Sequence, residues 1–234
     1  MDKLEKWHAH FVDVKTLVKW VEARKRAGMR QNRRTREIWT ACLFTICLEH
    51  NEDKRFLIGF PGRGVPKVTV TVDQIFADDF GEIEDWDVIL VADLGPDGPA
   101  DREFHQCQLV SYCFRPHPSS EDLIAFLEEK KVKKCPPDAD LRLIVHLDDA
   151  KPFSFDWVKI SIHFHMRRPK CPYNQVFLLA EMGTVENRHW SCWQVYPLGL
   201  PMKDMDVETA RRVLDDRTSY VVKFDPPKHD GIQS

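Results

Sequence analysis

The sequence predicts an α/β protein in which a mixed central β-sheet is flanked by helices. Apolar residues follow helical spacing near the N-terminus, strand-like runs dominate residues 56–114, and helical and strand patterns alternate after residue 118. With 234 residues, 43% of them hydrophobic and 30% charged, the chain has an ordinary soluble composition and can bury a sizeable core. Since no repeat or domain boundary is evident, we expect a single domain over residues 1–234.

Residues 1–50 are expected to form N-terminal helices. Apolar side chains recur from Leu4 through Val21 at the spacing of an amphipathic helix that extends to Ala27, and Gly28 is expected to end it. The segment 37–49 is apolar at most positions, which predicts a second, more buried helix.

Residues 51–150 are expected to form the core of the fold. β-Branched and aromatic runs bounded by Gly, Pro and Asp predict an antiparallel meander of strands at 56–60, 68–72, 88–91 and 106–114. A helix start with early acids follows Pro118, and this helix is predicted to run to about Lys134, before Pro136-Pro137. A strand over 141–147 comes next.

Residues 151–234 are expected to complete the sheet. The pattern predicts strands at 158–165, 176–181 and 190–196, a helix at 207–215 and a short strand at 219–224. The strands at 176–181 and 190–196 are predicted to form a buried hairpin.

The most informative residues lie on two predicted neighbouring strands. Asp87 opens one strand, and Gln106 and Gln108 lie two residues apart on the next. Side chains two apart in a strand point to the same face, so the two amides share a face that meets Asp87 if the strands pair. The sequence therefore predicts a site at this strand pair.

This order of elements, with an acid opening one strand and a polar-x-polar pair on the next, resembles the PD-(D/E)XK (restriction-endonuclease-like) superfamily over residues 35–150. It is most similar to those members, many of them prokaryotic, in which Gln-x-Lys replaces Glu-x-Lys. The resemblance implies that Asp87 matches the motif aspartate, Gln106 the Glu or Gln, and Gln108 the lysine. Glu37 would match the additional acid that some members carry on the preceding helix.

The resemblance implies a restriction-endonuclease-like core and a metal-dependent nuclease in which Asp87 and Gln106 hold Mg²⁺ or Mn²⁺. Such hard cations prefer oxygen ligands and activate water against a phosphate, while a lysine stabilises the growing charge. Because Gln106 is neutral as well as Gln108, only Asp87 brings formal charge unless Asp79, Glu82, Glu84 or Asp85 folds toward the site, so we expect weak metal affinity. Because Gln108 cannot supply the charge of the lysine, we expect weakened or lost cleavage. The alternative is that Gln106 and Gln108 are polar residues on the wet face of a half-buried strand.

Charge is divided unevenly along the chain. Residues 1–36 hold eleven Lys or Arg against four acids, whereas residues 73–103 hold eleven Asp or Glu against one Arg. The basic cluster predicts nucleic-acid binding through phosphate contacts, and an ordinary solvated helix face is the alternative. Its members are Arg24, Lys25, Arg26, Arg30, Arg33, Arg34 and Arg36.

A second group of candidate ligands consists of imidazoles and thiols near the C-terminus. Imidazole and thiolate suit Zn²⁺, but the group lacks Cys-x-x-Cys and finger-type spacing. Two of the histidines would share one face of the predicted strand 158–165 and could instead lie on the surface or line a groove. The candidates are His163, His165, Cys171, His189 and Cys192.

The chain has no apolar run of membrane-spanning length and no signal-peptide pattern, which predicts a cytoplasmic protein without a membrane partner. Its seven cysteines show no repeated spacing, so reduced thiols are expected. Two functions remain open: a nucleic-acid-acting nuclease relative, and a non-catalytic adaptor or subunit of the same fold that contacts another protein.

Overall fold

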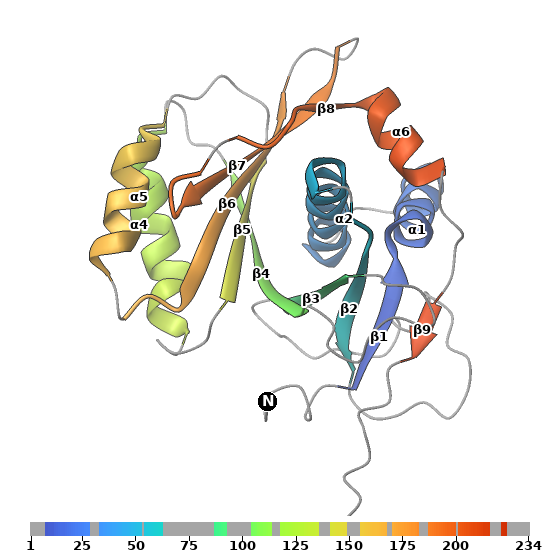
Figure 1. Cartoon of the computed structure of the whole chain (residues 1–234), viewed down its shortest axis with the longest axis horizontal. Helices are drawn as coiled ribbons and strands as arrows, with labels where there is room; N and C mark the ends of the chain where they lie inside the picture. Colours follow the sequence, from blue (N-terminus) through green and yellow to red (C-terminus); the bar gives the residue numbers. More distant parts are fainter. Residues whose placement is uncertain are drawn as a thin grey trace, which may run out of the picture.

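Nine strands of the described residues form one mixed sheet with helices on both faces (Figure 1). The strand order is β8-β7-β6-β5-β4-β3-β2-β1-β9. The predicted α/β class, a mixed sheet flanked by helices, is confirmed. The computed structural model describes residues 8–28, 33–52, 54–62, 87–92, 104–113, 118–135, 141–148, 155–167, 170–182, 187–199, 201–215 and 221–223.

The first half of the sheet is an antiparallel meander. It comprises β1 (His8–Asp13), β2 (Phe56–Gly62), β3 (Asp87–Ala92) and β4 (Phe104–Cys113), each antiparallel to the one before. The predicted antiparallel pairing of β3 with β4 is confirmed, but β2 pairs directly with β3, whereas the predicted meander placed a strand at 68–72 between them. The strand predicted at 68–72 lies outside the described residues.

The second half of the sheet contains parallel pairs and then a hairpin. Strand β5 (Leu141–Asp148) is parallel to β4 and to β6 (Tyr173–Met182), and β7 (His189–Tyr196) returns antiparallel to β6. The predicted hairpin is therefore confirmed. Strand β8 (Met205–Asp206) borders β7, and β9 (Val221–Lys223) pairs with β1 at the other edge.

Among the described helices, three cover one face of the sheet and two cover the other. The sheet curves around α2 (Arg33–Glu52), which lies beside α1 (Val14–Arg26) and α6 (Val207–Asp215), as Figure 1 shows. Helices α4 (Ser120–Lys130) and α5 (Trp157–Met166) lie side by side on the opposite face. A 3₁₀ turn, η2 (Val132–Lys134), follows α4.

The predicted N-terminal helix starts later than its apolar pattern suggested. Residues 8–13 pair with β2 as a strand, and the helix begins at Val14. Asp13 caps it by accepting a hydrogen bond from the backbone N–H of Thr16 at 3.0 Å. Gly28 follows the helix with a φ of 68°, in the left-handed region that favours glycine, so the predicted end is confirmed.

The strand predicted at 158–165 is wrong, because this segment is the helix α5. Asp156 caps the helix by accepting from the backbone N–H of Lys159 at 2.9 Å. Ile160 and Phe164, four residues apart, are buried, which is a helical spacing. An alternating strand pattern would also have placed Val158 on their face, but it is exposed.

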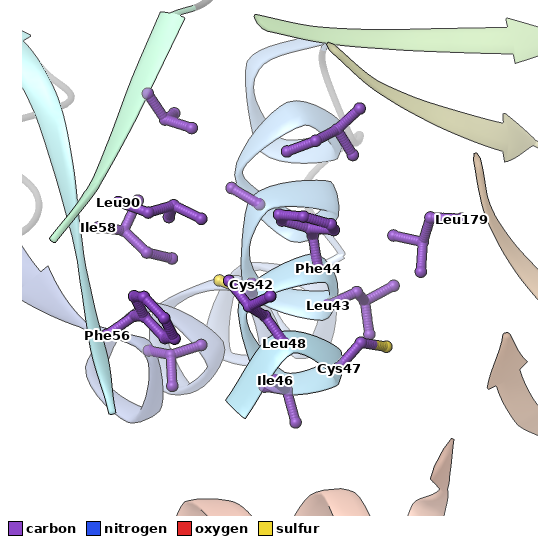
Figure 2. Close-up of a cluster of buried hydrophobic side chains, with 14 of the residues drawn as sticks. Cys42, Leu43, Phe44, Ile46, Cys47, Leu48, Phe56, Ile58, Leu90 and Leu179 are labelled. Atoms are coloured by element: carbon purple, nitrogen blue, oxygen red, sulfur yellow. The ribbon is translucent and has the colours of Figure 1, made fainter. Parts of the chain in front are cut away.

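Two hydrophobic clusters fill the two faces of the sheet. The α2 cluster, part of which Figure 2 shows, joins side chains such as Phe44 to Ile58, Leu90 and Leu179 of the strands. The α4/α5 cluster joins Leu123, Leu127 and Phe164 of the helices to Leu143, Val145 and Leu178. No helix within the described part of the chain is long and apolar enough to span a membrane.

Candidate functional site

The strand pair expected from the sequence forms in the structure. Asp87 of β3 lies directly opposite Gln108 of β4 in antiparallel register, and Ile89 lies opposite Gln106. Directly opposed residues of an antiparallel pair share a face, and so do residues two apart on a strand. The backbone therefore brings the positions of Asp87, Gln106 and Gln108 to one face of the sheet.

Gln108 is buried on the α4/α5 face and is engaged by protein atoms. Its exposed fraction is 8%. The hydroxyl of Tyr173 on β6 donates to Gln108 Oε1 at 2.6 Å, and Gln108 Nε2 donates to the sulfur of Cys135 at 3.7 Å. These contacts give the oxygen and the nitrogen of the buried amide a hydrogen-bond partner each, as burial of a polar group requires, and they fix the orientation of the side chain.

The donor set at this position fits Mg²⁺ or Mn²⁺ poorly. The oxygen of Gln108 already accepts the Tyr173 hydroxyl, and Gln106 is a neutral amide that is only half-buried. Hard divalent cations are usually held by carboxylates among their oxygen ligands. Within the described ranges, no three His, Cys, Asp or Glu side chains form a group that could hold a metal ion.

Glu37 does not join this strand pair. It lies buried on α2, and α2 packs against the face of β4 that carries Cys107 and Leu109. Because neighbouring residues of a strand point to opposite faces, Gln108 lies on the other side of the sheet. A carboxylate on α2 is therefore separated from the amide pair by the sheet itself.

The described members of the basic cluster lie where α1 ends and α2 begins, a region that we call the α1/α2 turn. Arg24, Lys25 and Arg26 occupy the last turn of α1, and Arg36 is exposed near the start of α2. This is the α2 side of the sheet, whereas Gln106 and Gln108 face α4 and α5. Two further members, Arg33 and Arg34, begin α2, and Arg30 lies outside the described residues.

The described cations at the end of α1 have partners within the protein. The Arg24 guanidinium lies 4.8 Å from the ring centre of Trp20, and Lys25 Nζ lies 4.2 Å from that of Trp39. Arg26 pairs with Glu22 at 3.6 Å. Burial lowers the pKa of Lys25 from its ordinary value. Two cations of the cluster, Arg24 and Lys25, therefore pack against tryptophan rings at the surface.

The imidazoles and thiols are dispersed. Because α5 is a helix, His163 and His165 do not share a face: His163 contacts Glu128 of α4 at 2.7 Å, while His165 is exposed. Cys171 is buried and donates to the carbonyl of Tyr173 at 3.6 Å. Burial raises the pKa of Cys192 well above its ordinary value, so this thiol stays protonated.

His189 belongs to a polar cavity that the sequence did not indicate. The cavity has a volume of about 540 Å³ and lies between the start of β7 and the start of α6. Two acidic residues that line the cavity make hydrogen bonds within the protein. Asp204 accepts from Ser191 Oγ at 2.5 Å, and Asp206 accepts from the backbone N–H of Thr209 at 2.7 Å. Only the tertiary arrangement assembles this cavity.

Comparison with known proteins gives no match: no family model, no curated protein and no solved structure matches the chain.

Proposed function

We propose that the chain is a nucleic-acid-binding protein with a restriction-endonuclease-like core whose phosphodiester-cleaving activity is weak or lost. The order α2, β2, β3, β4, α4, β5 and the parallel pairing of β4 with β5 support the resemblance seen in the sequence. The register that sets Asp87 opposite Gln108 supports it further.

The observation that carries the loss of cleavage is the buried contact between Gln108 and Tyr173. Gln108 occupies the position that matches the lysine of the PD-(D/E)XK motif. That lysine would stabilise charge on the phosphate, a contribution of about 3 kcal/mol or more to catalysis. A neutral amide that is already hydrogen-bonded inside the protein supplies no such charge. The chemistry at this position therefore favours binding over cleavage.

The α1/α2 turn presents exposed cations that suit phosphate. The side chain of Arg26 is 76% exposed, and Arg36 is also exposed. Packing of Arg24 and Lys25 against Trp20 and Trp39 holds their charges near the surface. Because this turn and the amide pair lie on opposite sides of the sheet, a nucleic acid bound at the turn is not presented to Gln106 and Gln108.

Binding is tested by fluorescence anisotropy with labelled single- and double-stranded DNA and RNA over a range of salt concentrations. We expect affinity to fall steeply with salt, because phosphate contacts release counterions. Arg26→Ala with Arg36→Ala should weaken binding to all sequences and reduce the slope of log affinity against log salt by roughly one per lost contact. Lys203→Ala, an exposed cation beyond β7, is the matched control.

Cleavage is tested with the same nucleic acids in Mg²⁺ or Mn²⁺, for the wild type and for Asp87→Ala. We expect binding without appreciable cleavage by either protein. Strong wild-type cleavage that disappears in Asp87→Ala would establish an active nuclease and refute the loss of activity. If no nucleic acid binds at low salt, the binding proposal fails and the adaptor hypothesis takes its place.

A further inference from the structure

One face of α5 exposes a continuous row of apolar side chains. Val158, Ile162 and Met166 are 53%, 52% and 78% exposed, and their spacing of four residues aligns them along the helix. They are three of the four large hydrophobic residues exposed in the described part of the chain. We name these three residues the α5 ridge. Contiguous apolar surface of this kind is typical of an interaction site.

The other sides of α5 are already used by the fold. Ile160 and Phe164 point into the α4/α5 cluster. The adjacent side faces α4, where Lys159 pairs with Glu121, and His163 and Arg167 both contact Glu128, Arg167 at 2.9 Å. The ridge lies outside both contacts, because its three side chains are more than half exposed.

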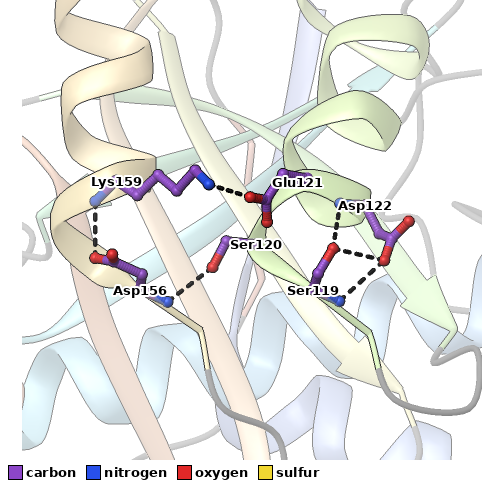
Figure 3. Close-up of polar contacts among 6 residues, drawn as sticks. All are labelled: Ser119, Ser120, Glu121, Asp122, Asp156 and Lys159. Atoms are coloured by element: carbon purple, nitrogen blue, oxygen red, sulfur yellow. Dashed lines mark hydrogen bonds and ion pairs between the residues drawn. The ribbon is translucent and has the colours of Figure 1, made fainter.

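The two ends of the ridge carry opposite charge. Helices α4 and α5 run in the same direction, because Glu121 meets Lys159 near their starts and Glu128 meets Arg167 near their ends. At their starts lie the exposed acids Glu121, Asp122 and Asp156, which Figure 3 shows; we call these the acidic end. Beyond their ends lie the exposed cations Lys130, Lys133, Arg167 and Lys170, the basic end.

We propose that the α5 ridge is the contact surface of a symmetric dimer, and that its occupant is the α5 ridge of a second copy of this chain. A twofold axis at Ile162 packs the two helices antiparallel, so that Val158 of one copy lies against Met166 of the other. The same operation places the acidic end of each copy against the basic end of its partner. A twofold interface must be complementary to itself, and this combination of apolar centre and opposed charges meets that condition.

The apolar part of the interface is tested by sedimentation velocity of the full chain over a range of concentrations. We expect a reversible monomer–dimer equilibrium that Ile162→Glu weakens roughly 30-fold or more, because the change buries a charge at the centre of the contact. Leu198→Glu is the matched control, since Leu198 is 52% exposed but lies after β7 and not on the ridge. Circular dichroism confirms that each variant is folded.

The charged ends are tested by substitutions that reverse the sign of one charge. Glu121→Lys and Lys170→Glu should each weaken the dimer, because like charges then meet at both ends. An equimolar mixture of the two variants should dimerise more tightly than either alone, since every end of the mixed dimer again meets its opposite. A wild type that stays monomeric at several hundred micromolar overturns the proposal. So does a dimer unaffected by Ile162→Glu, or a mixture no tighter than its components.

Discussion

At Gln108, the chemistry that the sequence suggested conflicts with the packing that the structure requires. A lysine there would supply the charge that the PD-(D/E)XK motif carries at the position to which Gln108 was compared. It would also place an ammonium group in a position that is 8% exposed and lined by Tyr173 and Cys135. Burial of an ammonium group costs desolvation energy even though Asp87 occupies the opposite position on β3, so the packing disfavours the lysine that the motif requires at this position.

Gln108→Lys is therefore expected to lower the free energy of unfolding by about 2–4 kcal/mol without creating cleavage. Gln106→Lys is the control: it lies on the same face but is half-buried, and should cost about 1 kcal/mol or less. Urea denaturation followed by circular dichroism measures both. A Gln108→Lys protein as stable as the wild type would show that the amide contact with Tyr173 is dispensable.

The thiols provide a second test at the residue scale. Burial raises the pKa of Cys47 to about 12 and that of Cys192 well above its ordinary value, whereas Cys135 is partly exposed. Since the thiolate is the reactive form, a raised pKa keeps a thiol inert until the pH approaches that value. At pH 8 we expect iodoacetamide to modify Cys135 in the folded protein and to leave Cys47 and Cys192 unmodified.

Mass spectrometry of the alkylated peptides separates these cysteines, and the same reaction in urea is the control in which all three should react. Rapid modification of Cys47 in the folded state would mean that the α2 cluster opens readily.

At the scale of elements, the pairing of β1 with β2 depends on a glycine beneath an aromatic ring. Phe11 lies directly opposite Gly59, and a Cβ atom added to Gly59 would lie 2.5 Å from Cε1 of that ring. The ring is buried on the face of the sheet opposite to Val12, Ile58 and the α2 cluster, so it cannot move away without disturbing its neighbours on that face. The absence of a side chain at Gly59 is thus a requirement of packing.

Gly59→Ala is expected to lower the free energy of unfolding by about 1–3 kcal/mol, because overpacking outweighs the small entropic gain of losing a glycine. Gly199→Ala is the matched control, since its added Cβ would meet only the Gln194 side chain at 3.4 Å or more. Thermal unfolding of both variants compares them. Equal stability of the two would contradict the close approach of Phe11.

At the scale of the whole molecule, the central strands belong to both hydrophobic clusters. On β5, Ile144 contributes to the α2 cluster, while Leu143 and Val145 contribute to the α4/α5 cluster. Loss of packing on one face therefore loosens a strand that the other face also needs. The two faces should unfold together.

Phe44→Ala in the α2 cluster and Leu123→Ala in the α4/α5 cluster should each cost about 2–5 kcal/mol and shift one common transition. Far-ultraviolet circular dichroism and tryptophan fluorescence should give the same midpoint for each variant. Lys133→Ala, an exposed change after α4, serves as the control. Two separate transitions in either variant would show that the layers fold independently.

Much of the fold was predictable because its signals are local. The start of helix α4 was predictable because Ser119 caps it, accepting a hydrogen bond from the Asp122 N–H at 3.1 Å. Strands β2 to β7 follow apolar runs bounded by turn residues. Helix α5 was missed because its β-branched residues suit a strand, although the cap at Asp156 and the spacing of Ile160 and Phe164 were available signals. In this segment, tertiary packing outweighed the strand preference of the β-branched residues.

The α/β class and most of the element order follow from the sequence, because periodicity, caps and turns act over a few residues. The register that sets Asp87 opposite Gln108, and the surfaces that these residues face, come from the three-dimensional arrangement. That Glu37 lies across the sheet, that Gln108 is covered by Tyr173, and that α5 turns three apolar side chains outward depend on which helix covers which face. Contacts between segments distant in the chain make that choice, and no local pattern encodes it.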